Sequence, residues 1–525
     1  MSSKNSKVLN LSEKDLKSYV ENALAYWKVP GVAVAIVKDG KVVLAEGYGY
    51  KDLENKKKMT ANTVLPIGSA SKSFTSMAAG ILVDEGKFDF DKPISNYIPG
   101  FRMFDPVAST YVSARDMLCH RTGMPRHDLM WAGGTGQSFT REDLIRRVQY
   151  LENSAQFREK AQYQNHMFAT VGYAVEKVSG KTWENFVQKR IFDPLGMKDS
   201  NFHVADSQKA ADFGLPYRHD EKKKIVRANF MELGAPAPAG SINSTVNDMT
   251  NWIKLILGKG AFGKKRIISE ERLAEMHTPH MPIHILPFEI PETYFLSTAL
   301  GWFTDIYRGH KVVHHGGNVT GFTALVTMMP DQDLGICILA NMNSTFITYA
   351  IQNHIYDLVL GAEKFDWNAD LKGKIDGLYK QMDDAKAEIV KSRVKNTNPS
   401  LDLKAYVGEY EHPGYGLITV TKNAKALQAD FNGNKMKMSH FHFDQFNLHL
   451  DTFKTELLSR FNLGAKGEVE SISVPFEAAV GKDIVFTRKA KEDKSKDKSK
   501  DKSTKSATKT AEAKKAVKKP AKKAE

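Results

Sequence analysis

Residues 65–86 read Leu65-Pro-Ile-Gly-Ser-Ala-Ser-Lys-Ser-Phe-Thr-Ser-Met-Ala-Ala-Gly-Ile-Leu-Val-Asp-Glu-Gly86. This order predicts a tight turn that leads directly into a helix, because apolar side chains recur every three or four residues and form one stripe facing a core. The stripe consists of Phe74, Met77, Ala78, Ile81 and Leu82. Gly86 stands where helices commonly end in a left-handed residue.

Ser69 and Lys72 stand at the start of this predicted helix, three residues apart and therefore on one face. Backbone N–H groups and the positive end of the helix dipole lie beside a hydroxyl in that position. A lysine one turn later can accept the hydroxyl proton when its surroundings lower its pKa. The pair thus has the Ser-x-x-Lys arrangement of serine acyl-transfer enzymes. The spacing alone is common, and a solvated first helical turn also explains it.

Two further motifs supply partners for this pair. Tyr163-Gln-Asn165 precedes a predicted helix. A phenol can shuttle protons if nearby cations lower its pKa, and an Asn amide can orient a lysine or a substrate carbonyl. His315-Gly-Gly317 opens a predicted strand, where glycines allow a substrate backbone to lie against the strand edge. Each motif alone also fits an ordinary loop or turn, so the argument depends on their combination.

Together the three motifs resemble those of the serine penicillin-recognising family, on the branch of class C β-lactamases, D-amino-acid peptidases and related esterases. That family places Ser-x-x-Lys, Tyr-x-Asn and Lys/His-x-Gly in this order at comparable separations. The surrounding sequence is similar as well, over the segments Ile67–Thr75, Leu118–Pro125, Pro238–Asp248 and His315–Phe322. The resemblance covers roughly residues 11–360.

The resemblance implies an α+β fold of the β-lactamase/transpeptidase type, with an antiparallel sheet flanked by helices and a helical subdomain. It also implies a catalytic set of Ser69, Lys72 and Tyr163. Ser69 would attack a carbonyl to form an acyl-enzyme, and Lys72 and Tyr163 would share the proton transfers. Water would then release the acyl group, and no cofactor or metal is expected.

The resemblance further implies a substrate-binding set of Asn165, His315, Gly317 and Asn318. Asn165 would position the catalytic lysine or the substrate amide. The backbone N–H groups of Ser69 and Asn318 would form the oxyanion hole. The His315-Gly-Gly317 strand would lie along the substrate.

Two departures from the family pattern bear on the substrate. His315 replaces the lysine usual in true β-lactamases, and Gly316 replaces a hydroxyl residue that commonly binds a substrate carboxylate. Both argue against efficient antibiotic hydrolysis and towards a small peptide or ester substrate. The predicted function is therefore a serine hydrolase acting on a peptide, including D-amino-acid-containing ones, or on an amide. One alternative is a carboxylesterase or weak β-lactamase on the same fold. Another is an inactive penicillin-binding-like protein whose basic tail binds nucleic acid or another polyanion.

The 525 residues exceed what one core usually holds, so several units are expected. Short alternating strands after residue 399 predict a small all-β barrel, which resembles the lipocalin-like domain of some peptidase relatives. The predicted units are a flexible N-terminus (1–10), the hydrolase domain (11–362), a helical linker (363–398), the barrel (399–488) and a disordered Lys-rich tail (489–525).

Local patterns predict the main elements. An Asp39-Gly40 turn indicates a hairpin of strands over 32–37 and 42–44, and Pro330-Asp-Gln-Asp indicates a second hairpin over 322–340. Ser12 is a candidate N-cap for the first helix. Predicted helices cover 11–27, 166–179, 248–257 and 367–394, and the clearest barrel strands cover 417–420, 427–431, 441–450 and 483–487.

The net charge of +14 is concentrated in the tail, because residues 489–525 contain 15 Lys against 6 Asp or Glu. Such a tail could contact nucleic acid or anionic surfaces weakly, although it lacks aromatic residues for stacking on bases. The N-terminus lacks the apolar segment of a secretory signal, and no run approaches the ~18 apolar residues of a membrane span. We therefore expect a cytoplasmic protein without a membrane span, and a homo-oligomer is compatible with the sequence.

Several other patterns are better explained by structure than by chemistry. Cys119 and Cys337 sit in apolar runs, which favours buried, inert thiols. His277, His280 and His284 have a spacing that could suit a metal, but they lie among prolines without Cys, Asp or Glu partners, so no metal site is predicted.

Overall fold

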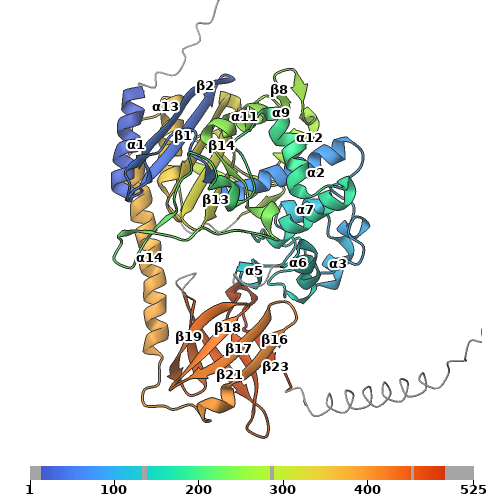
Figure 1. Ribbon diagram of the computed structural model, residues 1–525. Helices are drawn as coiled ribbons and strands as arrows, with labels where there is room; N and C mark the ends of the chain where they lie inside the picture. The colour runs from blue at the N-terminus through green and yellow to red at the C-terminus, as the bar shows by residue number, and fades with distance from the viewer. Residues whose placement is uncertain (1–12, 133–138, 284–288, 451–454, 491–525) are drawn as a thin grey trace, which may run out of the picture.

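The computed structural model describes residues 13–132, 139–283, 289–450 and 455–490. Figure 1 shows a larger body built on a central sheet and a smaller β-barrel below it, with the long helix α14 (Trp367–Lys391) running down one side between them. The Lys-rich tail from residue 491 onward and the candidate cap Ser12 lie outside the described residues.

The central sheet has nine strands in the order β10-β11-β12-β13-β14-β15-β1-β2-β3. Strand β1 pairs antiparallel with β15, with Val32 opposite Ala340, so the two ends of the hydrolase region complete one sheet as predicted. Asp39 and Gly40 have φ of 51° and 72°, which confirms the tight turn of the first hairpin. The strands are β1 (Gly31–Lys38), β2 (Lys41–Asp52), β3 (Lys57–Lys58), β10 (Met281–Pro282), β11 (Thr293–Thr298), β12 (Phe303–Tyr307), β13 (His310–Val319), β14 (Phe322–Met329) and β15 (Leu334–Ala340).

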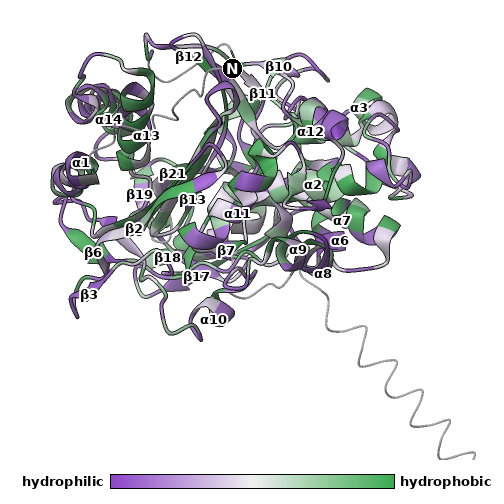
Figure 2. Ribbon diagram, turned by 90° about the horizontal axis from the view of Figure 1, so that it is seen from above, coloured by the Kyte–Doolittle hydropathy of each residue, from purple (hydrophilic) through white to green (hydrophobic). Residues whose placement is uncertain are grey.

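Alternate residues of β1 enter two different cores, because successive strand side chains point to opposite faces. Val32, Val34 and Ile36 pack with α1 (Glu13–Trp27) and α13 (Ile347–Leu360) on one face. Ala33 and Ala35 belong to the core on the other face, which contains the helix of Ser69. Figure 2 shows the sheet edge-on between these two groups of helices.

The helices beyond the second face form the predicted helical subdomain. The helix α7 (His166–Ser179) ends at Gly180, whose φ is 69°, as the sequence predicted. The other helices are α2 (Ser71–Asp84), α3 (Pro106–Tyr111), α4 (Ala114–Leu118), α5 (Leu129–Ala132), α6 (Arg141–Arg147), α8 (Trp183–Val187), α9 (Asp193–Leu195), α10 (Val204–Ser207), α11 (Val246–Leu257) and α12 (Glu270–Met276). Three two-stranded sheets lie among them: β4 (Leu65–Pro66) pairs with the sequence-distant β7 (Asn243–Ser244), and two hairpins pair β5 (Tyr217–His219) with β6 (Ile225–Arg227) and β8 (Ala261–Phe262) with β9 (Lys265–Arg266).

The C-terminal unit is a closed antiparallel barrel of eight strands, which confirms the predicted small β-barrel. Buried aromatic rings fill part of its interior; for example, the ring centroids of Tyr406 and Phe461 are 4.9 Å apart. The strands are β16 (Gly408–His412), β17 (Gly416–Asn423), β18 (Ala426–Phe431), β19 (Asn434–His442), β20 (Gln445–Leu450), β21 (Thr455–Leu463), β22 (Val469–Val474) and β23 (Ile484–Arg488).

The prediction of one strand over residues 441–450 was wrong. The segment contains the turn between β19 and β20, where Phe443 takes a left-handed φ of 45°. Asp444 is of a residue type common in turns, but the apolar side chains on both sides of it favoured one continuous strand and concealed the reversal.

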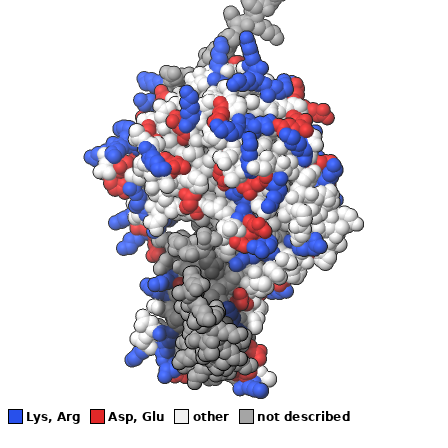
Figure 3. Space-filling view, turned by 45° about the vertical axis from the view of Figure 1, so that its right-hand side comes forward, with Lys and Arg blue, Asp and Glu red and all other residues white. Residues whose placement is uncertain are grey.

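The surface of the larger body mixes charges of both signs. On the face in Figure 3, Lys and Arg alternate with Asp and Glu over the larger body. Across the described residues, no helix combines the length and apolar character needed to cross a membrane.

Candidate active site

Ser69 lies in a single 3-10 turn, Gly68–Ala70, that runs directly into α2, as the sequence predicted. The preceding residue, Gly68, has a left-handed φ of 52°, which disfavours any residue with a Cβ atom. A Cβ atom there would also lie 2.9 Å from the backbone nitrogen of Asn318. Ser69 itself is half-buried, so its hydroxyl is accessible at the start of a buried helix.

Lys72 is fully buried and faces three oxygen atoms. Its Nζ donates to Ser69 Oγ at 3.1 Å, to Asn165 Oδ1 at 2.7 Å and to the carbonyl oxygen of Ala239 at 2.8 Å. Burial holds the pKa of Lys72 well below its usual range, and the nearby charge of Arg126 lowers it further. A lysine in this state can be neutral near pH 7 and can accept the Ser69 proton.

Tyr163 lies against the same lysine. Its ring centroid is 4.8 Å from Lys72 Nζ and 4.8 Å from the Arg126 guanidinium, and it stacks on His120 at 4.5 Å. Nearby cations could lower its pKa, but desolvation outweighs both the hydrogen bond to Ser69 and the charge of Arg126, so the pKa is raised. Tyr163 is therefore a neutral phenol, suited to donating a proton and not to acting as a phenolate base.

His315 sits on β13 beside this group. Its ring is buried, and its centroid lies 5.1 Å from that of Phe303 and 6.3 Å from that of Tyr163. Burial and the charge of Lys72 lower the pKa of His315 to about 3, so the imidazole is neutral. Its Nδ1 is 2.6 Å from the carbonyl oxygen of Gly316, which assigns the proton to Nδ1 and leaves Nε2 as an acceptor.

The backbone of β13 touches the turn that carries Ser69. A Cβ atom on Gly317 would lie 1.9 Å from the Ile67 carbonyl oxygen and 3.0 Å from the Ser69 nitrogen. Only glycine allows this approach. It places the backbone nitrogens of Ser69 and Asn318 at the contact between β13 and the turn that carries Ser69. Two N–H groups arranged in this way can stabilise the oxyanion of a tetrahedral intermediate.

The sequence did not identify two charged residues that organise the site, Arg126 and Asp128. Asp128 accepts a hydrogen bond from Asn165 Nδ2 at 2.9 Å, and it forms an ion pair with Arg126 at 2.6 Å. Asn165 is thus held between Asp128 and Lys72. No spacing signals these residues; the only indication is that they follow the segment Leu118–Pro125, which resembles a family signature.

The residue between them, His127, connects this turn to the β-barrel. Its backbone N–H donates to Glu477 Oε2 at 2.7 Å, and its ring Nδ1 lies 2.7 Å from the Tyr415 hydroxyl. Nε2 lies 2.8 Å from the carbonyl oxygen of Glu152, so Nε2 carries the proton and Nδ1 accepts from the tyrosine. In Figure 1 the next helix, α5, lies at the top of the barrel.

The histidines considered for a metal do not form a cluster among the described residues. His277 is buried with its pKa lowered to about 3, and its ring packs edge-on against Trp302 at 5.5 Å. His284 falls in the segment that the structure does not describe. Within the described ranges, no group of three or more potential ligands could hold a metal ion.

A family model for beta-lactamases matches residues 16–354, more than half of the chain and all seven residues of the candidate site. The chain belongs to the Beta-lactamase family. A second model, a domain of unknown function (DUF3471), matches residues 392–488 and covers the strands of the barrel. The structure thus shows a Beta-lactamase-family hydrolase fold followed by a closed barrel.

Several known proteins are similar to this chain. An unguisins hydrolase from Aspergillus campestris is 26% identical over 511 residues, which covers 91% of this chain and 92% of that protein. An octameric penicillin-binding protein homologue from Pyrococcus abyssi has a TM-score of 0.60 at 23% identity and covers 91% of this chain and 100% of its own. A D-amino acid amidase from Ochrobactrum anthropi SV3 has a TM-score of 0.56 at 22% identity. The match covers 66% of this chain and 97% of the amidase chain. The two solved structures share the fold with this Beta-lactamase-family chain.

Proposed function

We propose that the protein is a serine hydrolase that cleaves a peptide or amide bond through an acyl-enzyme on Ser69. The observation that carries this proposal is the buried Lys72, which touches the Ser69 hydroxyl and has a strongly lowered pKa. A structural lysine would normally be exposed or paired with a carboxylate. Here Lys72 hydrogen-bonds neutral oxygens, which favours an uncharged base.

In the proposed reaction, Ser69 Oγ attacks the substrate carbonyl carbon while Lys72 Nζ takes the hydroxyl proton. The carbonyl oxygen becomes an oxyanion bound by the N–H groups of Ser69 and Asn318. Tyr163, a neutral phenol, protonates the departing amine and is reprotonated by Lys72. A water molecule then attacks the acyl carbon, gives up its proton to the same groups, and releases the acid and free Ser69.

The state of His315 supports a peptide or amide substrate over a β-lactam. A neutral, buried imidazole cannot supply the positive charge that a lysine would offer at this place to a β-lactam carboxylate. The names of two similar proteins, an unguisins hydrolase and a D-amino acid amidase, agree with amide-bond cleavage. D-amino-acid-containing peptides are therefore the first substrates to test, and p-nitrophenyl esters would reveal the alternative, a carboxylesterase.

A fluorophosphonate probe tests the nucleophile directly. We expect the wild type to be labelled and Ser69→Ala to remain unlabelled. Ser76→Ala is a matched control, because Ser76 is a buried serine of the same helix whose hydroxyl has no hydrogen-bond partner in the described structure. Equal labelling of Ser69→Ala and wild type would remove Ser69 as the nucleophile.

A further inference from the structure

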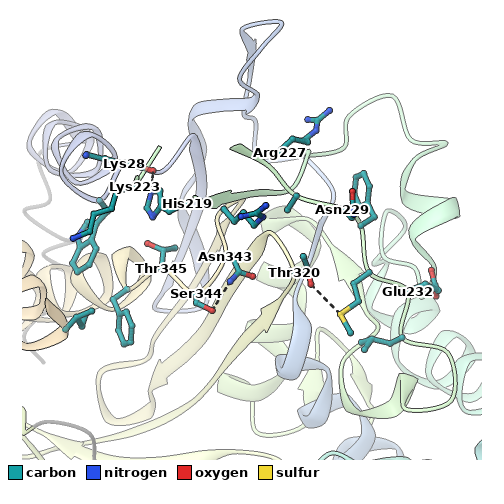
Figure 4. Close-up of a pocket in the computed structure, with 18 of the residues that line it drawn as sticks. Lys28, His219, Lys223, Arg227, Asn229, Glu232, Thr320, Asn343, Ser344 and Thr345 are labelled. Carbon is teal, nitrogen blue, oxygen red and sulfur yellow. Dashed lines mark hydrogen bonds between the residues drawn. The ribbon is translucent and has the colours of Figure 1, made fainter. Parts of the chain in front are cut away.

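The structure contains a cavity of about 1400 Å³, whose lining includes Lys28, Arg227 and Thr320 (Figure 4). Small-molecule sites usually measure ~300–1,000 Å³, so this cavity suits several amino-acid residues better than a single amide. It is bounded by the end of α1, the β5–β6 hairpin, residues 228–236, the turn after β13, residues 343–346 and α14.

One wall of the cavity lies near the turn that carries Ser69. Thr320, in its wall, follows Asn318 by two residues on the turn after β13. Leu233 also lines the cavity, and a Cβ atom on Gly240 would lie 3.1 Å from Leu233 and 3.7 Å from the carbonyl carbon of Gly68. Gly240 thus separates Leu233 of the cavity wall from the turn that carries Ser69, and the cavity lies within the span of a short peptide from that turn.

Positive charge prevails in the lining. Its five cationic residues are Lys28, Arg218, Lys223, Arg227 and Lys372, and its two acidic residues are Glu232 and Asp376. Lys372 pairs with Asp376, and Arg227 lies 3.6 Å from Glu54, outside the lining. Among the described residues, the side chains of Lys28, Arg218 and Lys223 have no ion-pair partner. Figure 4 shows Lys28 and Lys223 together on one side of the cavity.

The rest of the wall is rich in aromatic side chains, among them Tyr26, Trp27, Trp131, Phe139 and Phe230. In addition, Trp131 Nε1 and Arg218 Nη1 are buried donors without an acceptor in the described structure. Unpaired donors favour an occupant that brings acceptors, such as carboxylates and peptide carbonyls. The cavity therefore combines apolar surface with unpaired cations.

We propose that this cavity binds the part of a peptide substrate remote from the scissile bond, and that it selects a carboxylate on that part. The inference rests on the proposed function, because it takes the bond to be cleaved at Ser69. The carboxylate comes either from the peptide C-terminus or from an acidic side chain. Apolar side chains beside it pack on the aromatic wall.

Calorimetric titration of the full-length Ser69→Ala protein tests this without turnover. The probes are hexapeptides of Ala, Phe and Leu in four forms: blocked at both ends, with a free C-terminal carboxylate, with one Glu in a blocked peptide, and with one Lys in a blocked peptide. We expect at least one of the two hexapeptides that carry a carboxylate to bind about tenfold more tightly than the hexapeptide blocked at both ends. A few partly exposed charge pairs would produce a difference of this size. The difference should shrink with added salt.

Arg218→Met and Lys223→Met, in the same background, should reduce that preference. Lys224→Met is the matched control, because Lys224 is exposed on the same turn but does not line the cavity. Lys223 is also exposed, so its replacement should not affect folding. Equal binding of all four peptides, or a preference that survives both Met variants, would overturn the inference.

This outcome is separable from that of the proposed function. If Ser69 is labelled by fluorophosphonate but no carboxylate preference is found, only the cavity inference fails. If the preference is present while wild type neither hydrolyses these peptides nor reacts with the probe, the proposed function fails and the binding site stands.

Discussion

Replacing Glu477 of the β-barrel with alanine is expected to slow the reaction at Ser69. The Glu477 carboxylate accepts the backbone N–H of His127, and the neighbours of His127 hold the catalytic groups. On one side Arg126 covers Tyr163, and on the other side Asp128 anchors Asn165. The barrel therefore stabilises the turn that positions both the phenol and the base.

The structure sets the size of this effect. A hydrogen bond between a buried N–H and a charged group contributes ~1.5–3 kcal/mol, and its loss leaves the N–H unsatisfied. His127 also has a left-handed φ of 46°, a conformation that costs a non-glycine residue ~1–2 kcal/mol and favours relaxation once the bond is gone. Since 1.4 kcal/mol corresponds to a tenfold change, we expect kcat to fall about tenfold, with KM changed by less than about threefold.

The assay is kcat and KM across pH, with thermal unfolding as a measure of folding. If the turn moves, both Arg126 and Asp128 move away from Lys72. Because Arg126 has the larger effect of the two, the pKa of Lys72 rises and the acidic limb of the kcat/KM profile shifts to higher pH. Glu477→Gln keeps an acceptor oxygen and should recover much of the rate. Lys482→Met breaks the ion pair with Glu152 across the same interface and should change little. A folded Glu477→Ala protein with wild-type kcat and an unshifted pH profile would refute this reasoning.

Three further changes test the site itself. Gly317→Ala should leave the protein folded but reduce kcat at least about 100-fold, because the new Cβ would collide with the turn of Ser69 and disrupt the two oxyanion donors. A variant that fluorophosphonate labels at the wild-type rate would contradict this. Arg126→Gln removes a charge that lowers the pKa of Lys72, so the acidic limb of kcat/KM should move to higher pH. Asp128→Asn removes a charge that raises the same pKa, so that limb should move to lower pH; shifts in the same direction for both would show that Lys72 is not the titrating base.

Much of the fold follows from local patterns in the sequence. The helix over 166–179 and its end at Gly180 were predictable, because helical periodicity and a left-handed glycine are both local signals. The Asp39-Gly40 turn was predictable for the same reason. The wrong strand over 441–450 shows the limit, because the left-handed position of the turn is taken by Phe443, an aromatic residue that itself favours a strand.

The candidate site was only partly predictable. Ser69, Lys72 and Tyr163 belong to spaced motifs, and the structure brings these three residues together. Arg126 and Asp128 carry no motif, since their contacts depend on how a turn packs against Tyr163 and Asn165. The direction of the pKa shift of Tyr163 could not be predicted, because the sequence does not show how much water is excluded around the phenol.

These observations together assign the C-terminal barrel a physical role in setting the surroundings of Lys72. Burial lowers the pKa of Lys72 most, and burial is built into α2 and its surroundings. The two charged residues that adjust this pKa in opposite directions, Arg126 and Asp128, flank a single residue, His127. Because the barrel groups Glu477 and Tyr415 both bind His127, the contact between barrel and hydrolase body fixes the distances of both charges from the base. The protonation state of Lys72 therefore depends on the barrel as well as on the family fold around it.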